Sequence, residues 1–433
     1  MKFYSTNDKN HHVSLKEAVI KGMPDDGGLY LPVELPKIQT EILSSLSSNS
    51  FQETAFDVSR NLLKDSLPEA IIKNIIYDAF DFKLPLIRLD EQISVLELFH
   101  GPTLAFKDFA ARFMSRLMSY FIKDSNRELT ILTATSGDTG SAVADGFHKM
   151  DGINVIILYP SGMVSSLQEK QLTTIGDNVT ALEIKGTFDN CQNLVKQAFV
   201  DADLKKTLNL TSANSINIAR LIPQSLYYFY AYGQISNENI DVIISVPSGN
   251  FGNLTAGIMA KKMGLPISKF IASVNQNNSF TNYLNTGIFK PVQTVRTISN
   301  AMDVGNPSNF RRILDLYNHN VNEMKKDAVS YSFNDEQTKN TISKVYQKHN
   351  YILDPHGAVG YLGIQEYFKN YTSDAQAIFL ETAHPAKFRD VVEECIPDKI
   401  NIPKRLADCM LKEKSSTLLS KDYDDFKQYL SNF

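Results

Sequence analysis

Lys107 has unusual neighbours for a lysine. It follows a mostly apolar stretch of sequence and a Gly-Pro turn, and it lies between Phe106 and Phe109. The segment 96–109 reads LELFHGPTLAFKDF. Partial desolvation disfavours an ammonium ion and frees the amine to attack a carbonyl. The chemistry most often built on such a lysine is a Schiff base with pyridoxal 5'-phosphate. A lysine that extends its ammonium group to water from an amphipathic helix is the alternative.

A second segment has the features of an anion-binding turn. The apolar run Val242–Val246 ends at Pro247, and the next six residues, SGNFGN at 248–253, lead directly into a helix-like segment. Small residues let backbone N–H groups converge, and the start of a helix adds partial positive charge, so the turn predicts a phosphate cradle. It has neither the dinucleotide spacing nor a Walker lysine. A plain glycine-rich turn is the alternative.

Two further segments carry groups suited to anionic ligands. Residues 132–142, LTATSGDTGSA, read as a strand, a small polar turn and a helix. Asp138 in that turn either caps the helix or faces a cofactor hydroxyl. Residues 212–220, SANSINIAR, offer hydroxyls, amides and Arg220, whose guanidinium suits a phosphate ester. A polar loop that opens a helix is the alternative for this segment.

The elements that must position these residues alternate between strands and helices. The predicted strands are Val95–Leu98, Leu129–Thr133, Val155–Leu158, Thr180–Ile184, Val242–Val246, Phe270–Val274 and Ala377–Leu380. The predicted helices are Phe109–Phe121, Thr139–Lys149, Asn190–Val200 and Asn253–Met263. Continuously apolar strands between helices indicate an α/β protein with a parallel sheet covered on both faces. The first ninety residues look largely helical with few strands, and the segment after Pro403 predicts one or two helices.

Composition narrows the class of protein. A chain of 433 residues is too long for one ordinary core, so two or three domains are expected. The net charge of -4 and the pI of about 6.1 argue against nucleic acid or an anionic membrane as the main partner. Three scattered cysteines, together with His100, His356 and His384, lack metal-ligand spacing, so no metal site is expected. The N-terminus has no apolar stretch, and we expect a cytoplasmic protein.

Taken together, these segments resemble the threonine synthase family, whose members are pyridoxal-phosphate enzymes of fold type II, similar to tryptophan synthase β. Residues 96–109 look like the lysine motif of the family, 133–140 like its substrate loop and 248–252 like its cofactor-phosphate loop. Residues 299–304, SNAMDV, and 382–388, TAHPAKF, match in the family's order. The segment GGLYLP at 27–32 resembles the N-terminal domain of the longer bacterial and fungal subgroup.

The resemblance implies an architecture. It is the fold-type II arrangement of two three-layer α/β subdomains with parallel sheets, preceded by a mostly helical N-terminal extension. The implied divisions are an extension at 1–90, a catalytic core at 91–390 with the smaller subdomain around 110–200, and a helical tail at 391–433. The resemblance also implies a chain that works without a different partner subunit, as a monomer or homodimer, and the charge balance gives no nucleic-acid or membrane partner.

The resemblance further implies a reaction, in which O-phospho-L-homoserine and water give L-threonine and phosphate, the last step of threonine biosynthesis. Lys107 would hold pyridoxal phosphate as a Schiff base and move protons during γ-elimination of phosphate and β-addition of water. Thr382 would face the pyridine nitrogen. The cofactor phosphate would be held by Ser248, Gly249, Asn250, Phe251, Gly252 and Asn253. The substrate would be bound by Thr135, Ser136, Gly137, Asp138 and Thr139, and its phosphate by Asn214, Ser215 and Arg220.

Other readings share parts of this pattern. Cysteine synthases and serine/threonine dehydratases typically have Ser-x-Gly-Asn in the substrate loop, whereas this chain has Ser-Gly-Asp-Thr at 136–139. A phospholyase that releases 2-oxobutyrate and ammonia would need the same lysine and the same phosphate grip. A catalytically silent relative that binds the cofactor and regulates a partner is a further alternative, against which the intact Lys107 counts. A nucleotide-binding protein is disfavoured by the missing Walker and dinucleotide patterns.

Overall fold

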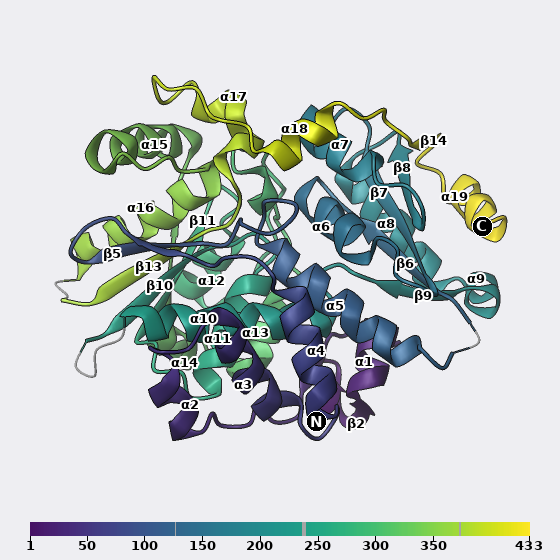
Figure 1. The fold of residues 1–433 in the computed structure, drawn as a ribbon, viewed down its shortest axis with the longest axis horizontal. Coiled ribbons are helices and arrows are strands. Elements are labelled where there is room, and N and C mark those ends of the chain that lie inside the picture. The colour runs from purple at the N-terminus through teal and green to yellow at the C-terminus, as the bar shows by residue number, and fades with distance from the viewer. Residues whose placement is uncertain (126, 236–239, 372–373) are drawn as a thin grey trace. The chain divides into compact units, whose positions relative to one another are not determined.

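The computed structural model of the chain describes residues 1–125, 127–235, 240–371 and 374–433. The chain divides into two compact units, each assembled from segments far apart in the sequence, and Figure 1 labels their helices and strands. Unit 1 comprises Met1–Lys2, Leu31–Phe106 and Leu221–Asn401. Unit 2 comprises Phe3–Tyr30, Lys107–Arg220 and Ile402–Phe433. Lys107 and Arg220 are therefore the first and last residues of the central segment of unit 2.

Unit 2 is built on a five-stranded sheet in the order β14-β8-β7-β6-β9, in which every neighbouring pair is parallel. Strands β6 and β7 are buried at nearly every position, as expected of parallel strands covered on both faces. The strand bounds are β6 (Leu129–Ala134), β7 (Ile153–Pro160), β8 (Val179–Ile184), β9 (Asn209–Ser212) and β14 (Thr417–Leu419).

Helices cover both faces of the unit 2 sheet. On one face, α8 (Phe188–Val200) and α19 (Tyr423–Ser431) share a hydrophobic cluster with alternate residues of β6, β7 and β8. On the other face lies α6 (Asp138–Phe147), where Gly140 approaches Ile157 of β7. Against α6 packs α5 (Lys107–Ile122), and this arrangement fixes the first residues of both helices. The remaining helices of the unit are α1 (Leu15–Lys21), α7 (Ser166–Thr173), α9 (Ala202–Thr207), the one-turn η1 (Ile218–Arg220) and α18 (Lys404–Met410).

Unit 1 is built on a six-stranded sheet in the order β12-β11-β10-β13-β5-β4. Its neighbouring pairs are parallel except at one edge, where β4 runs antiparallel to β5. Because β4 is short and mostly exposed, it closes the sheet edge without adding to the core. The strand bounds are β4 (Leu86–Arg88), β5 (Ile93–Glu97), β10 (Val242–Pro247), β11 (Lys269–Val274), β12 (Ala328–Ser332) and β13 (Gln376–Glu381).

Glycines allow two helices to lie close to the unit 1 sheet on opposite faces. In α11 (Gly252–Lys262), Gly257 approaches Phe270, and in α16 (Pro355–Asn370), Gly363 approaches Ile271 and Ser273. The remaining helices of the unit are α2 (Thr40–Ser45), α3 (Phe51–Leu63), α4 (Glu69–Ala79), α10 (Leu221–Ile235), α12 (Ser279–Thr286), η2 (Asn300–Met302), α13 (Phe310–Leu316), α14 (Val321–Asp327), α15 (Asp335–His349), η3 (Pro385–Phe388) and α17 (Arg389–Val392).

The structure confirms the α/β class and the elements expected from sequence. Each of the seven predicted strands and four predicted helices is present, with its ends displaced by at most two residues. Two expectations need correction. The N-terminal region holds strands β1 (Lys2–Ser5), β2 (Asp8–Ser14) and β3 (Tyr30–Pro32) besides its helices, and the segment after Pro403 adds β14 to its two helices. Both were missed because β2 is polar and exposed and β14 has only three residues, so neither shows an apolar pattern.

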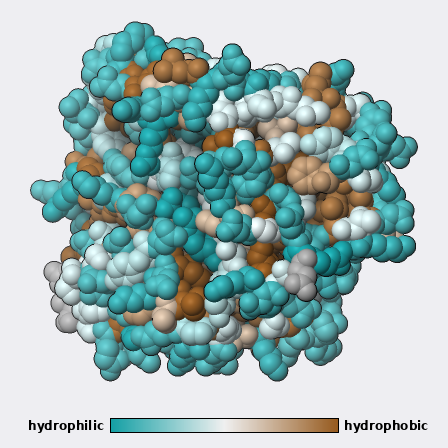
Figure 2. Space-filling view, turned by 45° about the vertical axis from the view of Figure 1, so that its right-hand side comes forward, coloured by the Kyte–Doolittle hydropathy of each residue, from teal (hydrophilic) through white to brown (hydrophobic). Residues whose placement is uncertain are grey.

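Figure 2 shows a face on which hydrophilic residues predominate and hydrophobic residues gather in small separate patches. Apolar atoms contribute much of the surface of any folded protein, so small patches of this kind are normal. Within the described residues, none of the helices combines the length and the apolar character that a membrane crossing requires.

Candidate active site

Lys107 is the first residue of α5, and its side chain is only 13% exposed. Its Nζ lies 3.4 Å from Oδ2 of Asp138, the first residue of α6, whose side chain is 3% exposed. A carboxylate beside a mostly buried ammonium group offsets part of the cost of removing that charge from water. The structure therefore gives Lys107 the desolvated setting that the sequence predicted, together with an acidic partner.

Asp138 is not the N-cap of its helix, which settles one alternative that the sequence left open. Gly137 occupies the N-cap position, and Asp138 instead accepts a hydrogen bond at Oδ1 from Nε2 of Gln168 at 2.8 Å. Gln168 comes from α7 and is 2% exposed. Gly137 has φ of 142°, and a Cβ there would lie 2.7 Å from the Gln168 amide. The turn thus requires glycine both for its backbone conformation and for the approach of Gln168.

The β6–α6 turn keeps two backbone donors available. Thr135, 1% exposed, uses its Oγ1 to accept the N–H groups of Gly137 and Gly140 at 3.0 and 2.9 Å. The N–H groups of Ser136 and Thr139 have no acceptor within the described part of the chain. Two donors at the start of a helix are suited to an anionic ligand.

The segment that carries Arg220 is tied to the same turn of unit 2. Asn214 donates from Nδ2 to the carbonyl of Ala134, the last residue of β6, at 2.9 Å, and Ser215 is half-buried beside it in the sequence. Arg220 is 2% exposed and donates from Nη1 to the carbonyl of Ala213 at 3.2 Å.

Arg220 retains an unused donor. Its Nε has no hydrogen-bond partner among the described residues. Burial lowers the pKa of its guanidinium to about 10, although the nearby Asp108 raises it. An unpaired donor on a buried cation is costly, so the site is suited to an anion that would satisfy it.

In unit 1, the β10–α11 turn presents a row of backbone donors. The strand β10 ends at Pro247, and α11 begins at Gly252 after Phe251, which has the left-handed φ of 59°. The N–H groups of Gly249, Phe251, Gly252 and Asn253 have no acceptor among residues that the structure describes. Converging N–H groups at a helix N-terminus form a nest for a phosphate. The donor set therefore fits the phosphate of pyridoxal phosphate.

Side chains of the same loop hold its shape. Asn253 donates from Nδ2 to the carbonyl of Pro247 at 2.8 Å and accepts at Oδ1 from the hydroxyl of Ser248 at 3.2 Å. Asn250 accepts at Oδ1 from the backbone N–H of Ser308 at 2.6 Å and from its hydroxyl at 3.0 Å. These bonds leave the backbone donors of the loop, rather than its amide side chains, to face a ligand.

The loop also rests against the predicted segment 299–304. A Cβ added to Gly249 would lie 2.5 Å from Cα of Met302 and 3.0 Å from the carbonyl oxygen of Ala301, both in η2. Because the neighbouring atoms belong to the backbone, they cannot rotate away as a side chain would. This close approach explains why the loop needs glycine at position 249.

Thr382 follows directly after β13 and is 6% exposed. Its carbonyl accepts the N–H of Phe106 at 2.8 Å, and Ala383 pairs with Ala105 in an isolated antiparallel bridge. Its hydroxyl has no hydrogen-bond partner among the described residues. The backbone around Thr382 is thus fixed while its hydroxyl is left to act on a ligand.

Comparison with known proteins identifies the family. The family model described as pyridoxal-phosphate dependent enzyme matches residues 83–382, and those described as threonine synthase N terminus and threonine synthase, C-terminal match residues 2–80 and 357–430. The chain is 43% identical over 430 residues to threonine synthase from Haemophilus influenzae, covering 99% of this chain and 98% of that one. The chain belongs to the threonine synthase family.

Solved structures agree with this membership. The crystal structure of threonine synthase from Escherichia coli is similar with a TM-score of 0.92 at 39% identity, and 100% of each chain is covered. The crystal structure of threonine synthase with bound pyridoxal phosphate from Brucella melitensis has a TM-score of 0.93 at 35% identity, with 100% of this chain and 99% of that chain covered. The fold type II class and pyridoxal phosphate as the cofactor are thereby confirmed.

Sequence reasoning missed one residue of the candidate site and left another unassigned. Gln168 stands thirty positions after Asp138 in a polar helix, and no local spacing marks it. The sequence excluded His356 only as a metal ligand, and the structure gives it specific partners at Asp354 and Ala301. The sequence Asp354-Pro355-His356-Gly357 does carry a signal, since Asp followed by Pro predicts a helix start.

Proposed function

We propose that the chain converts O-phospho-L-homoserine and water to L-threonine and phosphate. The observation that carries this proposal is the second anion-binding set in unit 2, where the buried Arg220 keeps an unpaired Nε. A pyridoxal-phosphate enzyme whose substrate had no phosphate would need only the one phosphate cradle. Membership of the threonine synthase family supports the same reaction and does not favour the phospholyase or silent-relative alternatives.

Each site residue has a proposed part in this reaction. Lys107 holds the cofactor covalently, and its amine moves protons at Cα and Cβ of the substrate. When bound, pyridoxal phosphate withdraws electrons from the substrate carbons, which lets phosphate leave from Cγ and water add at Cβ. Thr382 would offer its hydroxyl to the pyridine nitrogen of the bound cofactor. The cofactor phosphate is held by Ser248, Gly249, Asn250, Phe251, Gly252 and Asn253.

The substrate is proposed to bind through unit 2. Its carboxylate meets the β6–α6 turn, formed by Thr135, Ser136, Gly137, Asp138 and Thr139, and its phosphate meets Asn214, Ser215 and Arg220. The free N–H groups of Ser136 and Thr139 support the carboxylate assignment. The contact between Asp138 and Lys107 supports a role for Asp138 in keeping the lysine amine in place.

The organisation of the whole protein is also part of the proposal. Residues 1–90 form the N-terminal extension, 91–390 the catalytic core with the smaller subdomain around 110–200, and 391–433 the C-terminal tail. We propose that the protein acts in the cytoplasm as a monomer or homodimer without a nucleic-acid partner.

Product analysis tests this function. Purified protein loaded with pyridoxal phosphate is mixed with O-phospho-L-homoserine, and threonine, phosphate, 2-oxobutyrate and ammonia are measured. Threonine appearing one-for-one with phosphate supports the proposal. Phosphate accompanied by 2-oxobutyrate and ammonia would assign a phospholyase instead, and no release of phosphate would overturn the substrate assignment.

A further inference from the structure

Asp354 stands at the centre of a buried hydrogen-bond network in unit 1. It is the N-cap of α16 and is fully buried. Its Oδ1 accepts both the backbone N–H and the Nδ1–H of His356, each at 2.6 Å, and its Oδ2 accepts the N–H of Ala383 at 3.3 Å. Three donors therefore converge on one carboxylate at the start of a helix.

Both ring nitrogens of His356 have a hydrogen-bond partner. Nδ1 must donate because it faces the carboxylate of Asp354, and Nε2 must accept because it faces the backbone N–H of Ala301 at 3.2 Å. The ring is 2% exposed and packs edge-on against Phe388, with 4.8 Å between the ring centroids. His356 therefore connects Asp354 to Ala301 through one fixed tautomer.

Glu381 completes the network next to Thr382. Its Oε1 accepts the N–H of Asp354 at 2.6 Å, and a Cβ on Gly357 would overlap its carboxyl group. Burial, and then the negative charge of Asp354, raise the pKa of Glu381 well above its ordinary value. Burial thus favours the protonated form of Glu381.

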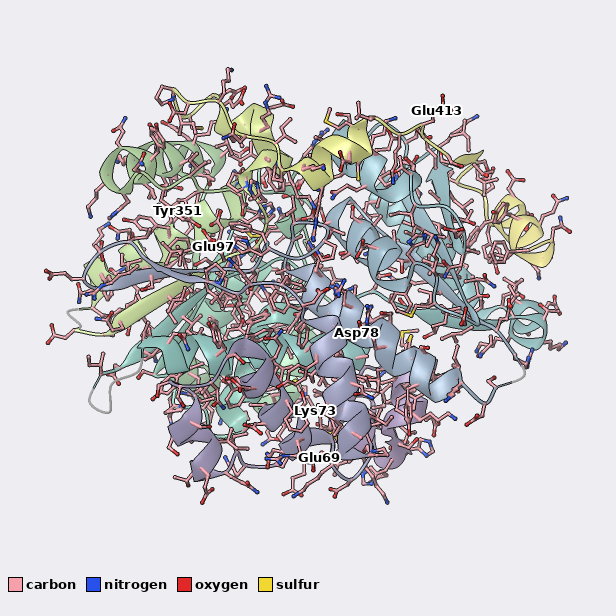
Figure 3. All side chains as sticks on the ribbon, in the orientation of Figure 1. Glu69, Lys73, Asp78, Glu97, Tyr351 and Glu413 are labelled. Atoms are coloured by element: carbon pink, nitrogen blue, oxygen red, sulfur yellow. The ribbon has the colours of Figure 1, made fainter. Side chains whose placement is uncertain are left out.

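A second acidic group is stabilised close by. Glu97, labelled with Tyr351 in Figure 3, accepts the Tyr351 hydroxyl at Oε1 at 2.8 Å and binds Nε2 of His100 through Oε2 at 2.6 Å. Both oxygens of Glu97 are therefore engaged by Tyr351 and His100, outside the bonds that Asp354 accepts.

Both ends of the network reach backbone that the cofactor is proposed to touch. Asp354 binds the residues on either side of Thr382, since its N–H bonds Glu381 and its side chain bonds the N–H of Ala383. Through His356 it also binds Ala301, and Ala301–Met302 is the backbone against which Gly249 packs. Each connection is a hydrogen bond or van der Waals contact between buried or half-buried groups of the same unit.

We infer that Asp354 and His356 are positioning residues that fix the Ser248–Gly252 loop relative to Thr382. They would thereby set the distance between the groups that bind the phosphate of the cofactor and its pyridine nitrogen. This inference rests on the proposed roles of the loop and of Thr382. It assigns no contact with the reacting atoms to either residue. The role of His356 requires that Ala301 keep its acceptor, because a half-buried N–H that loses its partner draws the backbone toward another one.

Two substitutions at His356 separate its bonds. Glutamine can place Oε1 near the position of Nε2 and accept the N–H of Ala301, whereas asparagine is too short and retains only the donor to Asp354. The rate of cofactor release from the holoenzyme and the 31P resonance of the bound cofactor phosphate are measured. His356→Asn is expected to speed release about tenfold, because the half-buried N–H of Ala301 is left without its acceptor, and to shift the resonance. His356→Gln should restore both values to within about threefold and near the wild-type position.

His349→Asn is the matched control. His349 is a buried histidine of unit 1 whose Nδ1 pairs with the carbonyl of Leu89, away from this network. It should change thermal stability without changing cofactor release or the 31P resonance. Equal effects of His349→Asn and His356→Asn would show general destabilisation and overturn the inference.

Gly249→Ala distinguishes a failure of this inference from a failure of the assignment on which it rests, that of the cofactor phosphate to the Ser248–Gly252 loop. If Gly249→Ala speeds cofactor release while His356→Asn leaves release and the resonance unchanged, the positioning role is wrong and the loop assignment stands. If Gly249→Ala also leaves both unchanged, the assignment of the cofactor phosphate to this loop is wrong, and the inference fails with it.

Discussion

The β10–α11 turn of unit 1 and the β6–α6 turn of unit 2 both follow a buried parallel strand, yet they offer different donors. The first presents backbone N–H groups, with its amide side chains occupied in holding the loop. The second keeps the backbone N–H groups of Ser136 and Thr139 and adds a side chain, since Asp138 faces Lys107 and Gln168. Backbone donors cannot change rotamer, whereas side chains can adjust during a reaction. This difference suits the first turn to a cofactor that stays and the second to a substrate that changes charge and leaves.

The largest effect should come from removing the lysine of unit 2. Lys107→Ala takes away both the covalent attachment and the proton-transferring amine, so kcat should fall by more than about 10⁴-fold. Turnover and the visible absorbance of the bound cofactor are measured. Lys123→Ala, an exposed lysine just after α5, is the control and should behave like wild type. An absorbance band that stays at the wild-type position in Lys107→Ala would move the attachment point elsewhere.

The next largest effect should separate the two phosphate sites. Arg220→Ala should lower kcat/KM for the phosphate ester by an amount equivalent to about 2–5 kcal/mol, the usual cost of truncating one partner of a buried charge pair. Cofactor release should stay unchanged, because the cofactor phosphate is assigned to unit 1. Arg220→Lys keeps the positive charge but loses the paired N–H donors of the guanidinium, so it should recover part of the loss in kcat/KM. Unchanged kcat/KM in the folded alanine variant would place the substrate phosphate away from Arg220.

A third change tests the rigid turn of unit 1. Gly249→Ala drives a methyl group against the backbone of Met302, so the loop must move and cofactor affinity should fall about 10- to 100-fold, as expected for overpacking a tight contact. Gly360→Ala is the control, since its Cβ would meet its nearest atoms at an ordinary 3.5 Å. Affinity is measured by titrating pyridoxal phosphate into cofactor-depleted protein. Similar affinities for the two variants would mean that the loop is not held against η2.

A smaller effect is expected in the adjustable turn of unit 2. Gln168→Leu removes the donor to Asp138, and kcat should fall about 2- to 10-fold with little change in KM, the range for one net hydrogen bond. Gln168→Glu places a second carboxylate against Asp138 and should reduce kcat further. Steady-state kinetics with both variants measures this order. A Gln168→Leu enzyme with wild-type kcat would show that Asp138 needs no support from α7.

The smallest effect on turnover is expected at His384, which acts on stability. Its Nδ1 accepts the N–H of Ala386, and burial lowers the pKa of its imidazole to about 4. Between about pH 6.5 and 4 the unfolded chain binds a proton there that the folded chain does not. The free energy of unfolding should therefore fall by up to about 3 kcal/mol as the pH drops through this window.

His384→Asn isolates this titration, because its side-chain oxygen can accept the N–H of Ala386 without binding a proton at these pH values. Urea unfolding at several pH values, with cofactor in excess, compares the two proteins. Between pH 6.5 and 4, the free energy of unfolding should fall less steeply with pH in the variant than in the wild type. The difference between the two proteins is the contribution of His384. Identical slopes would mean that His384 is not the group that titrates.

The sequence predicts the elements of this fold better than the links between them. Apolar runs such as Val242–Val246 reveal buried strands, and the small residues after Pro247 reveal the turn, because both depend on neighbours in the chain. Gln168 and Asp354 act on partners about thirty residues away, and no local pattern encodes such distances. The N-cap alternative for Asp138 illustrates the same limit, since only the packing of α7 shows which group its carboxylate meets.

The central claim is that the two phosphates bind to different kinds of donor. A crystal structure of the holoenzyme with a non-hydrolysable phosphonate analogue of O-phospho-L-homoserine tests it most directly. The account predicts the cofactor phosphate within hydrogen-bond distance of the N–H groups of Gly249, Phe251 and Gly252, and the phosphonate bonded to Arg220. A phosphonate on the Ser248–Gly252 loop, or an Arg220 guanidinium without contact to either group, would contradict it.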